Sequence, residues 1–598
     1  MFENLSDKQR EIVGFDKGTV VIKACPGSGK TYSVAARITK ILSENDFKRS
    51  GIAALSFTNV ACNEISIKLK QDFGFKLSLD HPHEICTLDS FINSYLFLPF
   101  GHLYMQCKKR PQLVGEPYSI WNIKRQYNNY DQYFDKTTFD INENLIRIAA
   151  YQAFHFKWNY YTKQGEINGH IKNIIKSKWD FFNKGFANQS DANFIAMQIL
   201  ERYPLIAENL VNKFDYFMID EAQDTDEIQM RIIEILNERG LKNIMLIGDR
   251  DQAIFEWNNA KPELFDKKYQ EWQKIDLNEN RRSSQNICNF IKHLSSFNIA
   301  NSINKDLKFY DYNPEIIGYK RKLKERNSEV WVVSPTESIQ SVDKILSYFC
   351  ATCEQNSIKI NKQNVAVLYR GLSQSELLRV KRDTFEFDKI PWLPNNYHVK
   401  NIVRGKHLYE NGHLKEGYKL SEKGLIEAIK KPSDNNFYCS DEFIETLVFE
   451  YGGLKKYRNF IFALINLLPT TKEITLNQWI KISNYNLVKY DIELKVHPEN
   501  GEVKIDELFG SNLQSDILPF YHGTVHSVKG RTFEAVLLLI GKKAGMNYVN
   551  LLSENINELK SEYKEELRII YVAISRPRKV LMLAVPNEDL KQWQEKFM

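Results

Sequence analysis

The sequence predicts an α/β protein built on parallel sheets, and three observations support that prediction. An apolar run, 19–22, is followed at once by a glycine-rich loop and then by a segment, 32–38, whose apolar residues have helical spacing. Two further apolar runs, 214–219 and 243–247, end in acidic and polar residues, as strands of an open parallel sheet do beside a ligand. Between these parts, helical patterns rich in aromatic residues and asparagine fill about 92–205, which indicates a mostly helical insertion.

The loop after the first strand has the composition of a phosphate-binding loop, although it lacks the first glycine of the general pattern. Gly27 and Gly29 allow backbone N–H groups to point at phosphate oxygens, Lys30 supplies a cation to the β and γ phosphates, and Thr31 offers a hydroxyl to Mg²⁺. We therefore expect ATP as the bound nucleotide and Mg²⁺ as the metal. The residues expected to line the nucleotide in this segment are Pro26, Gly27, Ser28, Gly29, Lys30, Thr31 and Tyr32.

The composition is that of an ordinary globular chain with several domains. At 598 residues it is too long for one core, and 43% apolar with 26% charged residues excludes a disordered class. The net charge of +6 permits nucleic-acid binding without requiring it. Two local basic clusters, 108–110 and 320–326, could each meet phosphate groups or could simply be solvated faces.

The cysteine spacing and the hydropathy indicate the cellular compartment in which the protein is expected. The eight cysteines have no paired spacing, which suggests a reducing environment. Cys350 and Cys353 form a single Cys-x-x-Cys, for which packing of a helix is favoured over a metal or redox site. No signal peptide and no apolar run of about 20 residues is found, so we expect a cytoplasmic protein without a membrane partner.

Two acidic residues end the strand at 214–219, as hydrolysis of Mg·ATP requires. Asp220 can hold Mg²⁺, and Glu221 can accept a proton from the attacking water. The next strand leads to Gln252, which could sense the γ-phosphate, and to Trp257, which could stack on a base. Near the N-terminus, Gln9 could read adenine with both faces of its amide, with a helix cap at Ser6 or Asp7 as the structural alternative.

Taken in order, these motifs resemble those of UvrD/Rep-like superfamily 1 helicases. The resemblance rests on the segments 5–9, 24–31, 56–59, 220–225, 248–257, 277–283, 364–370, 523–533 and 565–576. It implies two RecA-like cores with parallel sheets, each interrupted by a mostly helical insertion. By this analogy the first core is 1–91 with 206–276, its insertion is 92–205, the second core is 277–372 with 516–598, and its insertion is 373–515.

The resemblance also implies roles for individual residues. Arg282 and Arg576 match the family's arginine fingers, which stabilise the transferring phosphate when the cores close. Arg281, Gly530 and Thr532 match positions at the nucleotide. The positions that match DNA contacts are Phe57, Thr58, Asn59, Trp257, Thr524 and His526, with core packing as the alternative for Phe57 and Trp257 and a structural histidine as that for His526.

Four positions depart from the family pattern. Arg281 replaces an aromatic residue that stacks on adenine, so stacking would come from a guanidinium or from Tyr32. Thr532 removes a carboxylate near the nucleotide sugar, which puts nucleotide selectivity in doubt. Asn258 and Val60 replace basic residues and weaken the expected grip on DNA phosphates.

The resemblance predicts an ATP-driven DNA translocase or helicase that moves 3′→5′ on single-stranded or partly duplex DNA. The chain ends about twenty residues after Arg576, so we expect no fused nuclease and a separate nuclease partner. A narrower similarity to the helicase subunit of Gabija antiphage systems points the same way. The alternative from another class is a nucleotide-switched, DNA-sensing subunit that gates a partner without processive unwinding, and the intact Glu221 favours turnover over that switch.

Overall fold

A computed structural model describes most of the chain. The described residues are 2–45, 50–74, 81–114, 130–148, 164–254, 260–297, 302–321, 331–333, 342–370, 392–393, 397–412, 414–429, 447–448, 450–497, 499, 501–506, 508–509, 518–541, 552, 559 and 561–597. The chain divides into two compact units, which we describe separately. One comprises residues 1–116, 133–377 and 520–598, and the other comprises 117–132 and 378–519.

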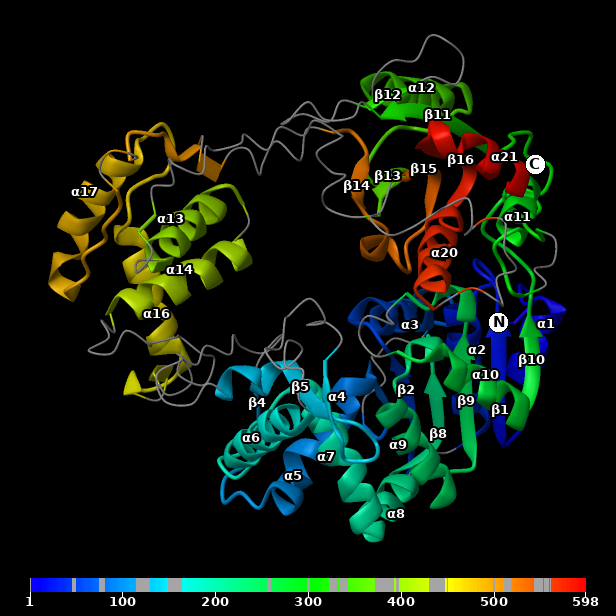
Figure 1. The fold of residues 1–598 in the computed structure, drawn as a ribbon, viewed down its shortest axis with the longest axis horizontal. Coiled ribbons are helices and arrows are strands. Elements are labelled where there is room, and N and C mark those ends of the chain that lie inside the picture. The colour runs from blue at the N-terminus through cyan, green and yellow to red at the C-terminus, as the bar shows by residue number, and fades with distance from the viewer. Residues whose placement is uncertain are drawn as a thin grey trace. The chain divides into compact units, whose positions relative to one another are not determined.

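The larger unit contains a first sheet in which all six strands are parallel. Its strand order is β10-β1-β9-β8-β2-β3 (Figure 1). The strands are β1 (Thr19–Ala24), β2 (Gly51–Ser56), β3 (Glu84–Thr87), β8 (Phe214–Ile219), β9 (Asn243–Gly248) and β10 (Gln273–Leu277). The helices associated with it are α1 (Asp7–Gly14), α2 (Lys30–Glu44), α3 (Asn59–Gln71), α9 (Glu227–Glu238) and α10 (Pro262–Glu271). The four central strands, β1, β9, β8 and β2, are mostly buried, as a doubly covered parallel sheet requires.

The segment between β3 and β8 is mostly helical where it is described, and the limits 92–205 of the insertion stay a prediction. It holds α4 (Leu88–Ile92), a π-helix (Asn93–Phe97), α5 (Leu98–Met105), α6 (Gln164–Phe182), α7 (Gln189–Arg202) and α8 (Pro204–Lys213). The segment also contains two small sheets that the sequence pattern does not predict. One pairs β4 (Gln112–Leu113) with β7 (Phe186–Ala187), and the other pairs β5 (Thr137–Phe139) with β6 (Leu145–Arg147). Strands of two or three residues are too short to show a period in the sequence.

The second sheet has the strand order β12-β11-β16-β15-β13-β14, and its pairs are parallel except for β11 with β12. The strands are β11 (Glu315–Arg321), β12 (Trp331–Val333), β13 (Val365–Tyr369), β14 (Tyr521–Thr524), β15 (Phe533–Leu539) and β16 (Pro577–Pro586). The accompanying helices are α11 (Gln285–Lys292), α12 (Val342–Gln355), α20 (Ser561–Ile574) and α21 (Leu590–Phe597). The predicted α/β class with two parallel-strand sheets is therefore confirmed.

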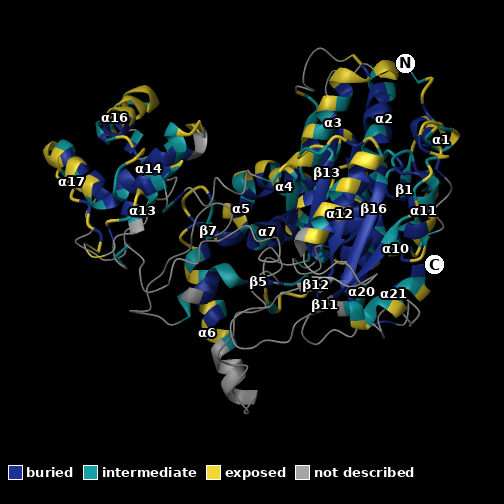
Figure 2. Ribbon diagram, turned by 90° about the horizontal axis from the view of Figure 1, so that it is seen from above, coloured by how far each residue is buried: buried dark blue, intermediate teal, exposed yellow. Residues whose placement is uncertain are grey.

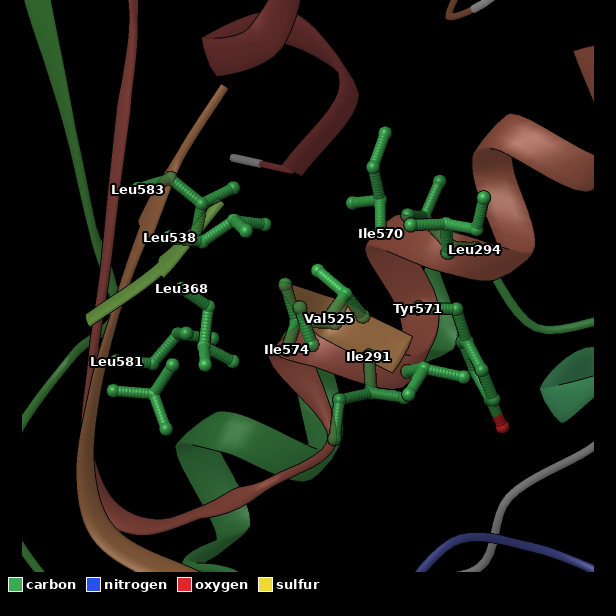
Figure 3. Packing of buried hydrophobic residues seen from close by; sticks show 14 of the residues in the cluster. Ile291, Leu294, Leu368, Val525, Leu538, Ile570, Tyr571, Ile574, Leu581 and Leu583 are labelled. Carbon is green, nitrogen blue, oxygen red and sulfur yellow. The ribbon is translucent and has the colours of Figure 1, made fainter. Parts of the chain in front are cut away.

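The core of the second sheet packs strand residues against α20. Figure 3 shows Leu368, Leu538 and Leu583 on the strands facing Ile570 and Ile574 on the helix, and all five are buried. This cluster also includes Cys25 and Ile254 of the first core, so apolar packing joins the two cores. Figure 2 shows the same pattern at larger scale, with buried strands such as β16 and outward faces exposed on α3 and α12.

The smaller unit is helical, with α13 (Tyr397–Glu410), α14 (Leu414–Ile429), α16 (Leu454–Leu467) and α17 (Leu476–Leu487) around a buried Trp479. These four helices lie within the predicted second insertion, 373–515. The exact domain limits stay a prediction.

Two further expectations concern cysteines and membranes. Cys350 and Cys353 lie in α12, and burial raises the pKa of the Cys353 thiol to about 12, which fits helix packing. Among the described residues, no group of three or more His, Cys, Asp or Glu side chains is arranged to hold a metal ion. Among the same residues, no helix has the length and apolar character needed to cross a membrane.

Candidate functional site

The phosphate loop joins the carboxyl end of β1 to the start of α2. Gly27 and Gly29 have φ of 70° and 82°, in the left-handed region that favours glycine. A Cβ atom would lie 2.6 Å from Arg282 Cβ at Gly27 and 2.7 Å from Gln9 Nε2 at Gly29. Both glycines are therefore required by backbone conformation and by close neighbours, and the loop's N–H groups precede a fifteen-residue helix, where an anion is favoured.

The acidic pair at the end of β8 meets this loop. Thr31 Oγ1 donates to Asp220 Oδ2 at 3.1 Å, and the Glu221 N–H donates to Asp220 Oδ1 at 2.9 Å. Burial, reinforced by the neighbouring Glu221, raises the pKa of Asp220 to about 7. A hydroxyl beside a buried carboxylate supplies the hard oxygen ligands that Mg²⁺ takes, so the donor set fits that ion.

Glu221 keeps its charge although it is buried. Burial opposes ionisation, but Lys30 and Lys529 outweigh it and lower the pKa of Glu221 to about 2. Its backbone has φ of 59°, a strained conformation that turns the residue out of the strand direction. Glu221 is thus an ionised carboxylate in the cleft, as a proton acceptor must be.

A chain of hydrogen bonds runs from Glu221 to Arg576. Gln223 Nε2 donates to Glu221 Oε2 at 2.5 Å, and the Asp249 N–H donates to Gln223 Oε1 at 3.0 Å. Gln252 Nε2 donates to Asp249 Oδ2 at 2.6 Å, and Arg576 Nη2 donates to Gln252 Oε1 at 2.8 Å. The first four residues belong to the first core and Arg576 to the second, so the two cores share one polar network.

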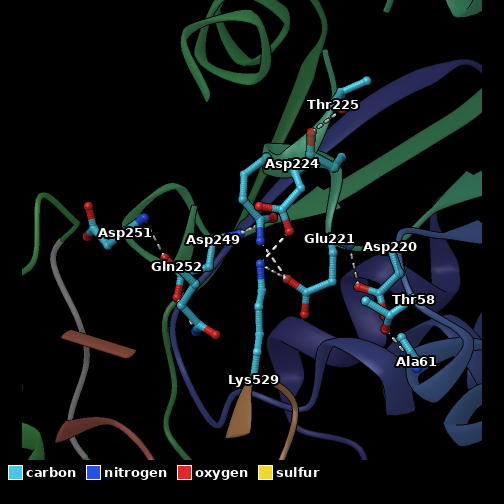
Figure 4. A network of polar contacts seen from close by, with 12 residues as sticks. Thr58, Ala61, Asp220, Glu221, Asp224, Thr225, Asp249, Asp251, Gln252 and Lys529 are labelled. Atoms are coloured by element: carbon cyan, nitrogen blue, oxygen red, sulfur yellow. Dashed lines mark hydrogen bonds and ion pairs between the residues drawn. The ribbon is translucent and has the colours of Figure 1, made fainter. Parts of the chain in front are cut away.

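Lys529 makes a second link between the cores. Figure 4 shows its side chain reaching the acidic cluster, where Nζ pairs with Asp224 and lies 3.9 Å from Glu221 Oε2. Burial raises the pKa of Asp224 to about 6, and Lys529 limits that rise. A cation from the second core therefore touches the carboxylates expected at the reacting phosphate.

The segment that leads from β10 into the second core forms hydrogen bonds with both cores. Asn280 Nδ2 donates to the Pro26 carbonyl at 2.9 Å, and the Arg281 N–H donates to the Gly27 carbonyl at 2.9 Å. Towards the second core, Arg282 Nη1 donates to the Ser575 carbonyl at 3.0 Å. Burial lowers the pKa of Arg282, and burial with the nearby Arg282 lowers that of Arg576 to about 9. Both guanidiniums remain charged at neutral pH.

Many of these residues line one cleft of about 420 Å³, whereas Asp220, Gln223, Asp249 and Asn280 lie behind its lining. The predicted residues that line it are Gly27, Ser28, Gly29, Lys30, Thr31, Tyr32, Phe57, Thr58, Glu221, Gln252, Arg281, Arg282, His526, Gly530, Thr532 and Arg576. The structure thus brings together most of the expected nucleotide and catalytic residues from both cores. Phe57, Thr58 and His526, which were expected at DNA, also lie on this cleft. Burial first, and then Arg370, lowers the pKa of His526.

Other predicted residues lie elsewhere. Gln9 is buried, its Oε1 accepts from the Ser6 N–H at 3.2 Å, and its Nε2 donates to the Ser28 carbonyl at 3.1 Å. Both faces of the amide expected to read adenine are thus engaged by the protein. Asn59 is exposed at the start of α3, and Thr524 ends β14. Trp257 and Asn258 lie outside the described residues.

Four polar residues of the site were not singled out from the sequence: Gln223, Asp224, Asp249 and Lys529. Each lies inside a segment that carried the resemblance, but each also has a partner in another segment of the chain. The Lys529–Asp224 pair spans 305 positions, and no spacing rule connects them.

Comparisons with known proteins identify related sequences. The family model of the UvrD/REP helicase N-terminal domain matches residues 5–273. The chain is 22% identical to the probable DNA helicase II homolog of Mycoplasma genitalium, over 98% of this chain and 86% of that protein. It is 24% identical to the ATP-dependent DNA helicase PcrA of Staphylococcus epidermidis and to that of Staphylococcus aureus, over 98% of this chain and 83% of each relative.

Proposed function

We propose that this chain, a UvrD-like superfamily 1 helicase and an ATP-hydrolysing enzyme, moves 3′→5′ along single-stranded DNA by closing and opening its two cores. The observation that carries the proposal is the shared cleft. The cleft has a volume of about 420 Å³. The first core contributes Lys30 and Glu221 to its lining, and the second core contributes Lys529 and Arg576. A site assembled from both cores is complete only when they meet, so chemistry and movement are coupled.

The chain's own groups divide the work of hydrolysis. The loop N–H groups and Lys30 hold the phosphates, Thr31 and Asp220 would hold Mg²⁺, and Glu221 takes the proton of the attacking water. Bound Mg²⁺ would neutralise charge on the phosphate oxygens. Gln252 orients groups at the γ-phosphate, and Arg282 and Arg576 stabilise the negative charge that develops there.

The same contacts explain how hydrolysis can drive motion. Arg576 and Lys529 reach the first core through polar contacts with Gln252 and Glu221, so both cations lie beside the position expected for the γ-phosphate. Loss of that phosphate removes the negative charge that the cations share, and the cores separate. Phe57, Thr58 and His526 lie on this cleft and belong to segments that match DNA contacts, so they are placed to pass a change at DNA to the nucleotide.

The DNA grip is proposed on two kinds of contact. Trp257 stacks on bases, which gives binding without sequence preference, while Asn59 and Thr524 reach the backbone. Single-stranded or partly duplex DNA is the substrate. The chain acts with a separate nuclease, either in DNA processing or in phage defence of the Gabija type. Co-purification of the chain with a nuclease tests this part of the proposal.

A strand-displacement assay tests the motor. Duplexes carrying a 3′ tail or a 5′ tail are compared with the wild-type chain and with Glu221→Gln, which keeps the size of the side chain but lacks the base. The proposal expects unwinding of the 3′-tailed duplex by the wild type alone. Vigorous ATP hydrolysis without unwinding of either tailed duplex would instead favour a nucleotide-switched subunit. The exposed Val60 agrees with that alternative, because it stands where a basic residue would bind DNA phosphates.

A further inference from the structure

Asp251 brings a buried carboxylate to the boundary between the two cores, next to the residue that meets Arg576. It is 6% exposed and belongs to the 3₁₀ turn Arg250–Gln252, which follows β9 (Figure 4). Gln252 of the same turn accepts a hydrogen bond from Arg576. Asp251 itself does not line the nucleotide cleft. Any influence that it has on hydrolysis must therefore pass through another residue.

The second core holds this carboxylate at both oxygens. The Ser296 N–H donates to Asp251 Oδ2 at 2.7 Å, and Ser296 Oγ donates to Asp251 Oδ1 at 2.6 Å. Ser295 Oγ also lies 2.9 Å from Asp251 Oδ2. Both serines follow α11, which accompanies the second sheet. Because both donors of Ser296 meet an ionised group, these hydrogen bonds are strong and fix the direction of the carboxylate.

These hydrogen bonds matter because the carboxylate is buried. Among the described residues, Asp251 forms no ion pair, and the neighbouring Arg250 pairs instead with Asp266 of α10 at 2.9 Å. A buried charge without a cation is costly unless hydrogen bonds satisfy it. When the cores separate, water has to replace the serines. The contact therefore stabilises the arrangement in which the cores meet.

The residue after Ser296 also touches the first core. Lys23 Nζ of β1 lies 5.0 Å from the centroid of the Phe297 ring and 5.6 Å from that of Tyr269 in α10. An aromatic face attracts a cation placed over it. The three consecutive residues 295–297, which we call the α11 turn, thus meet the first core through a carboxylate and through a cation.

The 3₁₀ turn therefore contacts the second core at two points. Asp251 meets Ser296 in the α11 turn, and Gln252 meets Arg576 just after α20. On the first-core side, Asp249 accepts from the Asp251 N–H at 3.0 Å and from Gln252 Nε2 at 2.6 Å, so it holds both residues. Residues of α11 and α20 pack in one apolar cluster. A shift of the second core away from Asp251 would consequently move Arg576 away from Gln252 as well.

We propose that Asp251 is a positioning residue for ATP hydrolysis: with Ser296 it fixes the second core so that Arg576 reaches Gln252 and the γ-phosphate. The inference rests on the role proposed above for Arg576 in the motor. Loss of the contact should slow the chemical step and leave ATP binding intact, because Lys30 and the N–H groups of the phosphate loop do not depend on it.

Steady-state hydrolysis by single variants tests this role. Asp251→Asn keeps the size of the side chain but places an N–H group against the donors of Ser296. Its kcat should fall by about 10-fold, as expected for loss of a hydrogen bond to a charged group, while the KM for ATP stays within about twofold. Ser296→Ala, a milder change at an exposed position, should lower kcat by about threefold. Ser296→Thr keeps the hydroxyl and should retain the wild-type kcat.

A matched control removes a hydrogen bond between a carboxylate and a serine that lies inside the first core. Asp215 Oδ2 accepts from Ser50 Oγ at 2.5 Å, and Asp215→Asn should leave both kcat and KM unchanged. Wild-type kcat in both Asp251→Asn and Ser296→Ala would overturn the proposal.

A double-variant cycle separates positioning from support of the fold. If Asp251 acts through Arg576, Asp251→Asn should cost little further rate in a chain that already carries Arg576→Ala. Single-turnover hydrolysis measures this rate. A full additional loss of about 10-fold in the double variant would show that Asp251 acts independently of Arg576 and would refute the inference.

Hydrolysis with and without single-stranded DNA keeps this inference distinct from the proposed function. If DNA stimulates the wild type while the variants at Asp251 and Ser296 match it, the motor stands and the positioning role fails. If DNA has no effect on the wild type while Asp251→Asn still lowers kcat at unchanged KM, the motor fails and the positioning role stands.

Discussion

Arg576 Nη2 lies 2.8 Å from Gln252 Oε1, and this hydrogen bond joins the second core to the first across the candidate ATPase cleft. Both side chains are buried, so the bond is shielded from water. Gln252 in turn donates to Asp249, which is linked through Gln223 to Glu221. The finger arginine and the candidate base are therefore positioned by one network rather than independently.

Replacement of Arg576 by alanine should abolish most hydrolysis while nucleotide binding persists. Arginine fingers contribute about 10³-fold or more to the rate, and Lys30 with the loop N–H groups remains in place to hold the phosphates. Single-turnover hydrolysis and binding of a fluorescent ATP analogue measure the two effects. Arg531→Ala, which removes an exposed cation from the same core, serves as the control and should hydrolyse ATP normally. A variant lacking Arg576 that turned over at the wild-type rate would refute its role.

Gly248→Ala should lower kcat without weakening nucleotide binding. A Cβ at residue 248 would lie 2.6 Å from Gln223 Oε1 and would push that side chain away from Glu221 and Asp249. Gln223→Leu removes the same bonds directly and should give the same split between kcat and KM. Steady-state kinetics of both variants check this. Gly14→Ala, whose added Cβ would have no heavy atom within 4 Å, tests glycine replacement in general. If Gln223 only filled space, the leucine variant would keep its kcat.

Asp226→Asn should stabilise the protein at alkaline pH. Burial, together with the neighbouring Asp89, raises the pKa of Asp226 to about 7, while its Oδ1 caps α9 by accepting from the Gln229 N–H at 2.7 Å. A raised carboxyl pKa gives stability that is complete below about pH 4 and is lost as the pH rises through 7. Asparagine caps a helix equally well without that loss.

The pH series should therefore separate two variants at Asp226. The free energy of unfolding of Asp226→Asn should exceed that of the wild type by about 1–2 kcal/mol at pH 8 and match it near pH 4, the side chain's partial exposure reducing the full effect. Asp226→Ala should be less stable by about 1 kcal/mol at low pH, where only the cap matters. Parallel curves for the wild type and the asparagine variant would show that the carboxyl does not titrate in this range.

Arg281→Ala should raise the KM for ATP and leave kcat nearly unchanged. Arg281 lines the cleft beside Tyr32, its backbone is fixed by the Gly27 carbonyl and by Asn304 Nδ2 at 2.8 Å, and its guanidinium can lie against a base. Arg281→Tyr keeps a flat stacking surface and should recover most of the affinity. Because Gln9 is engaged by the protein, we expect the wild type to accept GTP with a KM close to that for ATP. Strong preference for ATP in steady-state competition would contradict this.

Much of the fold and part of the site could be predicted from the sequence. The phosphate loop and the strands that lead to Glu221 and Gln252 follow local rules of composition and period, and the structure brings these residues to one cleft. The partners of Gln9 and Lys529 could not be predicted, because side-chain contacts between distant segments depend on how the two cores pack. The same reason explains why Phe57 and His526, expected at DNA, lie on the nucleotide cleft.

Steady-state ATP hydrolysis with and without single-stranded DNA, by the wild type and by Glu221→Gln, tests the central claim most directly. The account predicts strong stimulation by DNA in the wild type and no hydrolysis by the variant, which should still bind ATP because Lys30 and Thr31 are intact. Normal hydrolysis by Glu221→Gln would contradict the assignment of the base. Hydrolysis by the wild type that ignored DNA would contradict the motor.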